Sequence, residues 1–161
     1  MATIDDFTTE ELQQIQHAPV YVIAGAVASE TSGVFGAMRE MIDGVEGFAT
    51  SMAQADDSLL TEIFKGIDKT QPDDFDIDEV TREEIREATM DKGIASAVAA
   101  YQLLASKAEL TDADAYAQSL LSASSAAVRA AKTGGFLGFG AETITDREAE
   151  YVQRLADSLG Y

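Results

Sequence analysis

The stretch from Val20 to Ser29 carries no charged side chain, although the chain as a whole is rich in acidic residues. A helix that is apolar on every side is normally buried. Pro19 stands directly before this stretch, where proline is favoured as the first residue of a helix. We therefore expect Val20–Ser29 to be the central helix of the fold, preceded by a separate short helix that begins at Thr8 and runs towards His17.

Amphipathic helices account for most of the remaining chain. Val34–Gln54 has apolar residues at spacings of three, four and seven, which form one stripe, and 58–67 repeats this on a smaller scale. Three capping boxes, at 8–11, 81–84 and 145–148, mark helix starts, and Gly160 marks an end. Asp112, or Thr111 with Asp114, is expected to cap a further helix that extends to about Lys132. No segment alternates like a strand.

These patterns predict an all-α fold, a single-domain bundle of six or seven helices covering residues 1–161. Its expected core helices are Val20–Ser29, Val34–Gln54 and those around Ile94–Leu104 and Ala115–Ala131. Between Asp68 and Asp91 lie ten acidic and three basic residues, and Pro72 interrupts any helix entering this stretch. We expect an acidic linker near residues 68–80.

The charge balance narrows the classes of partner. The 161 residues include 29 acidic and 11 basic ones, a formal net charge of −18. Such a field repels phosphate backbones and anionic lipid, so we expect neither nucleic acid nor a membrane as partner. The acidity is either a generally solvated surface or an adaptation to concentrated salt, and we favour the halophilic interpretation.

The cellular location is expected to be the cytoplasm. The chain has no cysteine, so it offers neither a disulfide framework nor a thiol nucleophile. Its first residues, MATIDDFTTEEL, lack the basic and apolar regions of a signal peptide. The longest apolar run, Ala18 to Ala28, is too short to cross a bilayer.

Acidic residues are absent from one long segment. From Ala115 to Ala141 the only charged side chains are Arg129 and Lys132. Such a segment can be an interior helix with small residues that pack closely, which is the interpretation we favour. The alternative is a surface that is covered by a partner or by a second copy of the chain.

Two features could bind a metal ion or act in catalysis. Asp74, Asp76 and Asp78 alternate like the first ligands of a calcium loop, but Glu79 replaces the glycine of the sharp turn and Ile85 replaces the bidentate glutamate. A solvated acidic linker is therefore the favoured interpretation. His17 is the sole histidine, and we expect it to form a hydrogen bond or cap at a helix junction rather than to act in catalysis.

The loop from Gly134 to Gly140, GGFLGFG, is the most distinctive segment. It lacks the Lys-Ser/Thr pair of a phosphate-binding loop. Phe136, Leu137 and Phe139 are either anchors that fold the loop onto the core or apolar side chains that dock into a partner. Its glycines allow backbone conformations that other residues rarely adopt.

Two segments carry a resemblance to known proteins. Residues 130–133, the GGFLGFG loop and residues 143–148 resemble the C-terminal signature of an uncharacterised family of small acidic helical proteins of bacteria and archaea. The stretch 18–30 with Gly33, Arg39 and Glu40 is similar to the same family, and together they cover less than half of the chain. This resemblance implies a fold and no activity.

A more distant similarity connects both segments to the tellurite-resistance TerB-like fold. That fold has an Ala-Asp-Gly turn and an acidic metal site, which would correspond here to Glu30, Gly33 and Glu40, and in a second repeat to Gly135 and Glu148. The first turn reads Glu-Thr-Ser-Gly instead, and the second has no acid before its glycines. The resemblance implies an internal helix-turn-helix duplication.

Three functions follow from these observations. The leading one is a non-catalytic helical interaction or stress-associated protein that self-associates or binds another protein through the low-acid segment and Phe136, Leu137 and Phe139. The alternative is a TerB-like protein that binds a divalent cation through Glu30, Glu40 or the run with Asp74, Asp76 and Asp78. The third is an enzyme that acts through carboxylates alone, without a cofactor.

Overall fold

The computed structural model describes residues 2–29, 33–54, 58–65, 82–133 and 144–161, with the side chains of 33–40, 53–54, 58 and 131–133 outside the description. Over these residues the chain forms six α-helices and no strand, which confirms the all-α bundle. The helices are α1 (Thr9–Ala28), α2 (Gly33–Gln54), α3 (Ser58–Phe64), α5 (Arg86–Lys107), α6 (Leu110–Thr133) and α7 (Asp146–Leu159). Two 3₁₀ turns, Ile4–Asp6 and Glu83–Ile85, precede α1 and α5.

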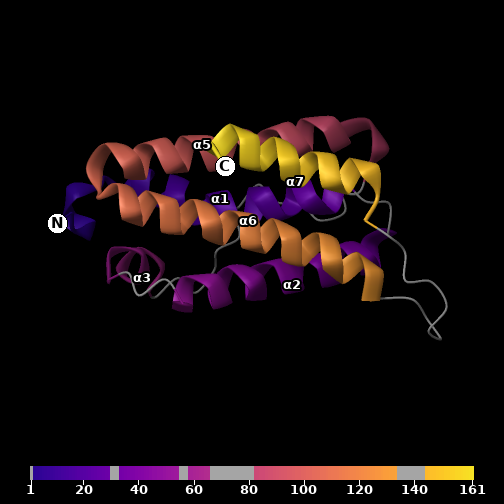
Figure 1. The fold of residues 1–161 in the computed structure, drawn as a ribbon, viewed down its shortest axis with the longest axis horizontal. Helices are drawn as coiled ribbons and strands as arrows, with labels where there is room; N and C mark the ends of the chain where they lie inside the picture. The colour runs from indigo at the N-terminus through magenta and orange to yellow at the C-terminus, as the bar shows by residue number, and fades with distance from the viewer. Residues whose placement is uncertain (1, 30–32, 55–57, 66–81, 134–143) are drawn as a thin grey trace.

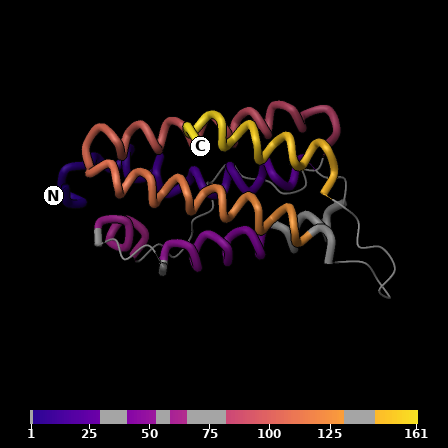
Figure 2. Tube along the Cα trace, in the orientation of Figure 1, coloured from indigo at the N-terminus to yellow at the C-terminus, as the bar shows by residue number. Residues whose placement is uncertain are grey.

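The long helices lie side by side along one axis (Figure 1). The most extensive packing joins α2 to α6 and α1 to α5, and α1 also contacts α6 and α2. The shorter helix α7 lies over α5 and α6. The N-terminus is at one end of the bundle, and the C-terminus lies partway along it (Figure 2). None of the described helices combines the length and apolarity needed to cross a membrane.

The second half of α1 lies at the centre of the bundle, as its lack of charge predicts. Every residue from Ala18 to Ser29 except Tyr21 is buried. The predicted break before it is wrong, because α1 is one continuous helix with Pro19 inside it. Proline has no amide hydrogen, so the carbonyl of Ile15 lacks its usual donor four residues on. The buried hydroxyl of Tyr116 on α6 supplies that donor, with Oη 2.6 Å from the Ile15 oxygen.

The capping predictions are confirmed at two helix starts. The Thr8 and Thr145 hydroxyls accept hydrogen bonds from the Glu11 and Glu148 amides, and both boxes are reciprocal. Gly160 ends α7 in the left-handed conformation, with φ of 86°. The box expected at 81–84 depends on Thr81, which lies outside the described residues, and α5 itself begins at Arg86 after a 3₁₀ turn. Helix α6 starts at Leu110, before the predicted cap Asp112.

Small residues bring α2 and α6 into close contact. A Cβ at Gly47 would lie 2.6 Å from the Cβ of Ala126, and one at Gly44 would lie 3.2 Å from the Cβ of Ala127. One side of α6 is buried throughout its length, from Ala113 to Ala130. The interior explanation of the low-acid segment is therefore confirmed for this side of α6. Residues 134–141 of that segment, and the acidic linker near 68–80, lie outside the described residues.

Candidate functional site

Most of the predicted site residues lie outside the described part of the chain. This applies to Glu30, Asp74, Asp76 and Asp78 of the cation hypothesis and to Phe136, Leu137 and Phe139 of the interaction hypothesis. The backbone of Glu40 belongs to α2, but its side chain is not described. Among the described residues, no group of three or more His, Asp or Glu side chains is placed to hold a metal ion. Both predictions therefore stay predictions at these residues.

The carboxyl groups near the N-terminus have structural contacts. The pKa of Glu11 is lowered, chiefly by the Lys107 ammonium, whose Nζ lies 2.6 Å from its carboxylate. The pKa of Asp6 is lowered chiefly by the hydrogen bond from the Thr3 backbone amide. A general acid at neutral pH needs a raised pKa instead. His17 lies half-buried inside the continuous helix α1, so the predicted role at a helix junction is wrong.

An open groove lies between the C-terminal half of α6 and α7, with a volume of about 280 Å³. Its floor and walls are mainly apolar, and three polar side chains besides the buried Glu148 reach it. The residues that define this α6–α7 groove are Ser125, Val128, Arg129, Ile144, Glu148, Ala149, Val152, Gln153 and Ala156. Ile144, at one end of it, leaves 50% of its surface exposed.

One buried tyrosine fixes the position of α7. The Tyr151 ring enters a notch between α1 and α5, where Gly25 and Gly93 leave room for its phenol. A Cβ at either glycine would overlap the ring or its hydroxyl. The Tyr151 hydroxyl donates a hydrogen bond of 2.8 Å to the Val22 carbonyl in the buried half of α1. Burial raises the pKa of this phenol, so it stays neutral and keeps donating.

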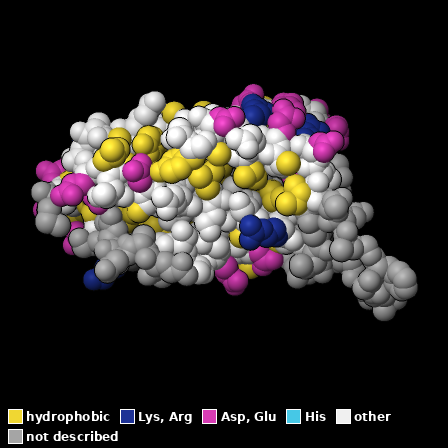
Figure 3. All heavy atoms as spheres, in the orientation of Figure 1, with side chains coloured by type: hydrophobic (Ala, Val, Ile, Leu, Met, Phe, Trp, Pro, Cys, Tyr) yellow, Lys and Arg dark blue, Asp and Glu magenta, His cyan; other side chains and the backbone are white. Residues whose placement is uncertain are grey.

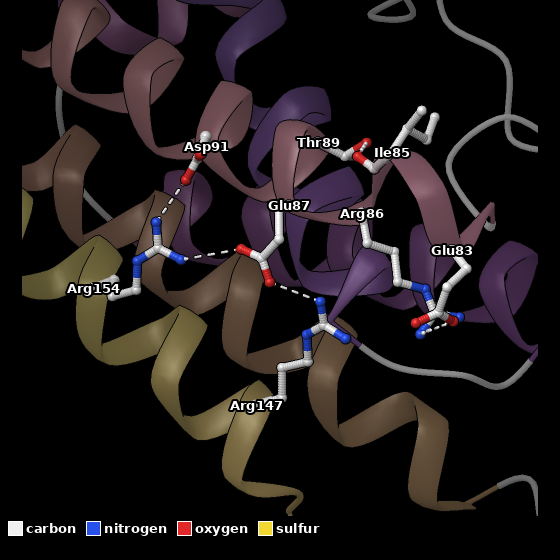
Figure 4. Close-up of polar contacts among 8 residues, drawn as sticks. All are labelled: Glu83, Ile85, Arg86, Glu87, Thr89, Asp91, Arg147 and Arg154. Atoms are coloured by element: carbon white, nitrogen blue, oxygen red, sulfur yellow. Dashed lines mark hydrogen bonds and ion pairs between the residues drawn. The ribbon is translucent and has the colours of Figure 1, made fainter.

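Ion pairs complete the attachment of α7 on the side away from the groove. Figure 4 shows Arg147 and Arg154 extending from α7 to Glu87 and Asp91 on α5. Arg147 Nη2 lies 2.7 Å from a Glu87 oxygen, and Arg154 Nη2 lies 2.6 Å from an Asp91 oxygen. These four side chains are partly exposed, so each pair contributes at most about 1 kcal/mol.

The α6 side of the groove differs in charge from the paired side chains between α7 and α5. Arg129 on α6 is exposed beside the groove and makes no ion pair within the described residues. The acids of α6, Asp112 and Asp114, lie at its other end. Figure 3 shows apolar side chains gathered in a band along the face where α6 and α7 meet, with basic atoms beside it.

Further apolar side chains are exposed where α6 begins and α7 ends. Leu110 and Tyr161 leave 62% and 46% of their surface exposed. The Tyr161 hydroxyl donates a hydrogen bond of 3.1 Å to Asp114 at the start of α6. Partial burial, followed by this carboxylate, raises the pKa of Tyr161 to about 12. A second exposed pair, Ile42 and Val45, lies on α2.

Comparison of the chain with protein-family models, curated proteins and solved structures finds no match. The resemblances to the small acidic helical family and to the TerB-like fold therefore stay predictions. Sequence reasoning missed the groove itself and the tyrosine that positions α7. The sequence feature that pointed to this surface is the absence of acidic residues from Ala115 to Ala141.

Proposed function

We propose that this chain is a non-catalytic helical interaction protein and that the α6–α7 groove is its binding surface. The observation that carries the proposal is an open, mainly apolar groove whose wall on α6 carries no acidic residue, in a strongly acidic protein. Contiguous exposed apolar surface on a soluble domain is typical of an interaction site.

The shape of the groove suits a helical ligand. Its wall on α7 extends from Glu148 to Ala156, which corresponds to about 12 Å at 1.5 Å per residue. Recognition of an amphipathic helix requires apolar anchors at i, i+3 or i+4, and i+7, which span about 10 Å. The groove is long enough for three such anchors, and its open side leaves the polar face of a ligand in water.

The second exposed apolar pair is a weaker candidate. Ile42 and Val45 project from α2 next to Asp43 and Glu46. A partner that approaches there must displace water from two acidic side chains, and desolvation of charges opposes association. The acid that lines the groove is the buried Glu148, whose carboxylate already accepts a hydrogen bond from the Thr145 amide.

The net charge of −18 suggests where this interaction takes place. Two acidic proteins repel each other at low salt, and the repulsion falls as the Debye length shortens. We place the protein in the cytoplasm of a salt-rich cell, where association through an apolar groove is least opposed. This setting supports a protein partner and disfavours an anionic polymer.

Site-specific crosslinking tests the proposal. A photo-crosslinking residue in place of Ala149, which is exposed in the groove, should form protein–protein adducts in the native cell at the native salt concentration. The same residue in place of Ala95, exposed on α5 and outside the groove, is the matched control. Adducts from Ala95 alone, or from neither position, would contradict the proposal.

A further inference from the structure

The solvent side of α2 carries an apolar stripe of its own, separate from the small residues that face α6. Helix α2 lies at the edge of the bundle and packs against α6, α1 and α3 (Figure 1). On its other side Ile42 and Val45 leave 54% and 41% of their surface exposed, and Ala49 is exposed as well. Met52 extends the stripe as a half-buried residue. These four residues form the outer α2 stripe.

The spacing of the outer α2 stripe is typical of a seam between paired helices. Its residues follow one another at intervals that alternate between three and four, and the sequence continues this alternation towards the start of α2. The six positions are Phe35, Met38, Ile42, Val45, Ala49 and Met52. Such intervals give a repeat of 3.5 residues, the period at which one helix packs along another at a shallow angle. The occupant that fits this stripe is therefore a helix.

Charged residues border the stripe along one rim. Glu46 follows Val45 directly and is exposed, and Arg39 occupies the same register position one heptad earlier. The opposite rim consists of Met41, which is half-buried, and Phe48, which is buried in the bundle. One rim therefore has a basic and an acidic position, which are seven residues or about 10 Å apart along the helix.

A two-fold axis that is perpendicular to α2 and lies in the plane of contact pairs the stripe with itself. This operation makes two copies of α2 antiparallel, exchanges their ends and keeps each rim on its own side. When Ile42 of one copy lies level with Val45 of the other, Arg39 comes within two residues, or about 3 Å along the axis, of Glu46 of the other copy. We infer that the outer α2 stripe is covered by a second copy of this chain, in an antiparallel α2–α2 dimer with two Arg39–Glu46 contacts.

The charged rim distinguishes this occupant from others. A foreign helix must displace water from Glu46, and desolvation of an unpaired charge opposes association. A parallel pair of α2 helices brings opposite rims together, so that Arg39 and Glu46 face the apolar rim of the other copy. Antiparallel copies instead supply an opposite charge to each of them. The α6–α7 groove lies on other helices, so this inference does not depend on the function proposed for it.

The arrangement also predicts how dimerisation depends on salt. Each copy carries −18, so the long-range force between two copies is repulsive. From about 0.1 M to about 1 M KCl the Debye length falls from about 10 Å to about 3 Å, which removes this repulsion over longer distances first. The apolar contact along the stripe is not weakened by KCl. Dimerisation should therefore strengthen across this range.

Light scattering with size exclusion, on the full chain at several KCl concentrations, is the direct experiment. The wild type should form a dimer that weakens at low salt. I42E should raise the dimer dissociation constant at least about 100-fold, because it places two unpaired carboxylates in the apolar seam. L110E changes an equally exposed apolar residue outside the stripe and should leave the dimer unchanged. Far-ultraviolet circular dichroism and thermal unfolding check that the variants are folded.

Reversal of the rim charges tests the pairing itself. R39E and E46R each create two like-charge contacts, so each should raise the dissociation constant about tenfold in about 0.1 M KCl. R82E and E10R, at exposed positions on other elements, change the net charge by the same amounts and are the matched controls. E46R is the sharper variant, because it lowers the net negative charge and should nevertheless weaken the dimer. In an equimolar mixture of R39E and E46R both contacts join opposite charges, so the mixture should recover the dimer.

The outcomes bear on this inference separately from the proposed function. A folded wild-type monomer at every KCl concentration overturns it. A dimer that persists in I42E, or one that is as tight in E46R as in E10R, overturns it as well, because the contact then lies on another surface. A folded pair of charge variants whose mixture stays monomeric contradicts the antiparallel register. The crosslinking experiment at Ala149 decides on the groove, whichever of these results is found.

Discussion

The bundle joins its helices in two different ways. Between α2 and α6 the contact is rich in glycine, alanine and serine, with one aromatic pair, Phe48 and Tyr116. The backbones approach so closely that a Cβ at Gly47 would meet the Cβ of Ala126 at 2.6 Å. Between α7 and its neighbours the contact depends on one buried tyrosine and on arginine side chains that extend to α5. The second interface leaves an open groove against α6.

The size of the side chains at each contact determines whether surface is left uncovered between the helices. Small residues let two helices pack along their whole length, as in the α2–α6 pair. Long side chains hold α7 against α1 and α5, so its other flank remains uncovered over α6. The same comparison predicts different responses to substitution, pH and salt.

The largest effect is expected from filling the α2–α6 contact. Gly47→Leu should lower the free energy of unfolding by about 3 kcal/mol, because Ala126 has no flexible atoms that can move away. Ala49→Leu, at an exposed position on the same helix, is the matched control and should change it by less than about 0.5 kcal/mol. Urea unfolding measures both. Equal changes for the two variants would show that the α2–α6 contact is loose.

Alkaline pH should weaken both regions. Burial raises the pKa of Tyr116 and of Tyr151 above the usual value of 10. The folded protein therefore keeps protons that the unfolded chain releases. Stability should be complete below pH 10 and should fall above it, by about 1.4 kcal/mol per pH unit for each tyrosine.

Urea unfolding between pH 9 and pH 11, with tyrosinate absorbance, tests this pH dependence. Replacing either tyrosine by phenylalanine should remove its share of the slope. Ionisation of all five tyrosines near pH 10 in the folded protein would be inconsistent with the burial of these two.

Removal of each buried tyrosine hydroxyl on its own should lower the stability by a different amount. Tyr116→Phe should cost about 2 kcal/mol, because it leaves the Ile15 carbonyl without a donor opposite Pro19. Tyr151→Phe should cost about 1 kcal/mol, since the Val22 carbonyl can still accept from the Ala26 amide in the helical pattern. Thermal unfolding of both variants at neutral pH compares them. A larger loss for Tyr151→Phe would contradict this account of Pro19.

The smallest effect is expected at the ion pairs of α7. Arg154→Gln should destabilise the protein by about 0.5 kcal/mol in dilute buffer, because the pair with Asp91 is partly exposed. In about 1 M KCl the loss should disappear, whereas the loss from Gly47→Leu should not change. Urea unfolding at both salt concentrations makes the comparison. A salt-independent loss at Arg154 would indicate packing of its side chain rather than its charge.

Much of the fold could be predicted from local patterns. The buried half of α1 and the caps at Thr8 and Thr145 follow from spacing and from side-chain chemistry within a few residues. The stripe predicted on α2 is only partly right, because α6 packs against Gly44 and Gly47 and leaves Ile42 and Val45 exposed. The boundaries at Arg86 and Leu110 could not, because several acids and hydroxyls near each start could serve as a cap. The site was predictable only as a stretch without acids, and its loop residues Phe136, Leu137 and Phe139 lie outside the described part of the chain.

By itself, the sequence determined that the chain is helical, that its surface is strongly acidic and that the second half of α1 is buried, since these depend on composition and periodicity. Only the tertiary structure decided that α1 continues through Pro19, because the missing donor comes from Tyr116, a hundred residues further on. It also decided where α7 lies, because the notch for Tyr151 forms only when Gly25 and Gly93 come together. The groove results from the position of α7, so no local sequence pattern predicts it.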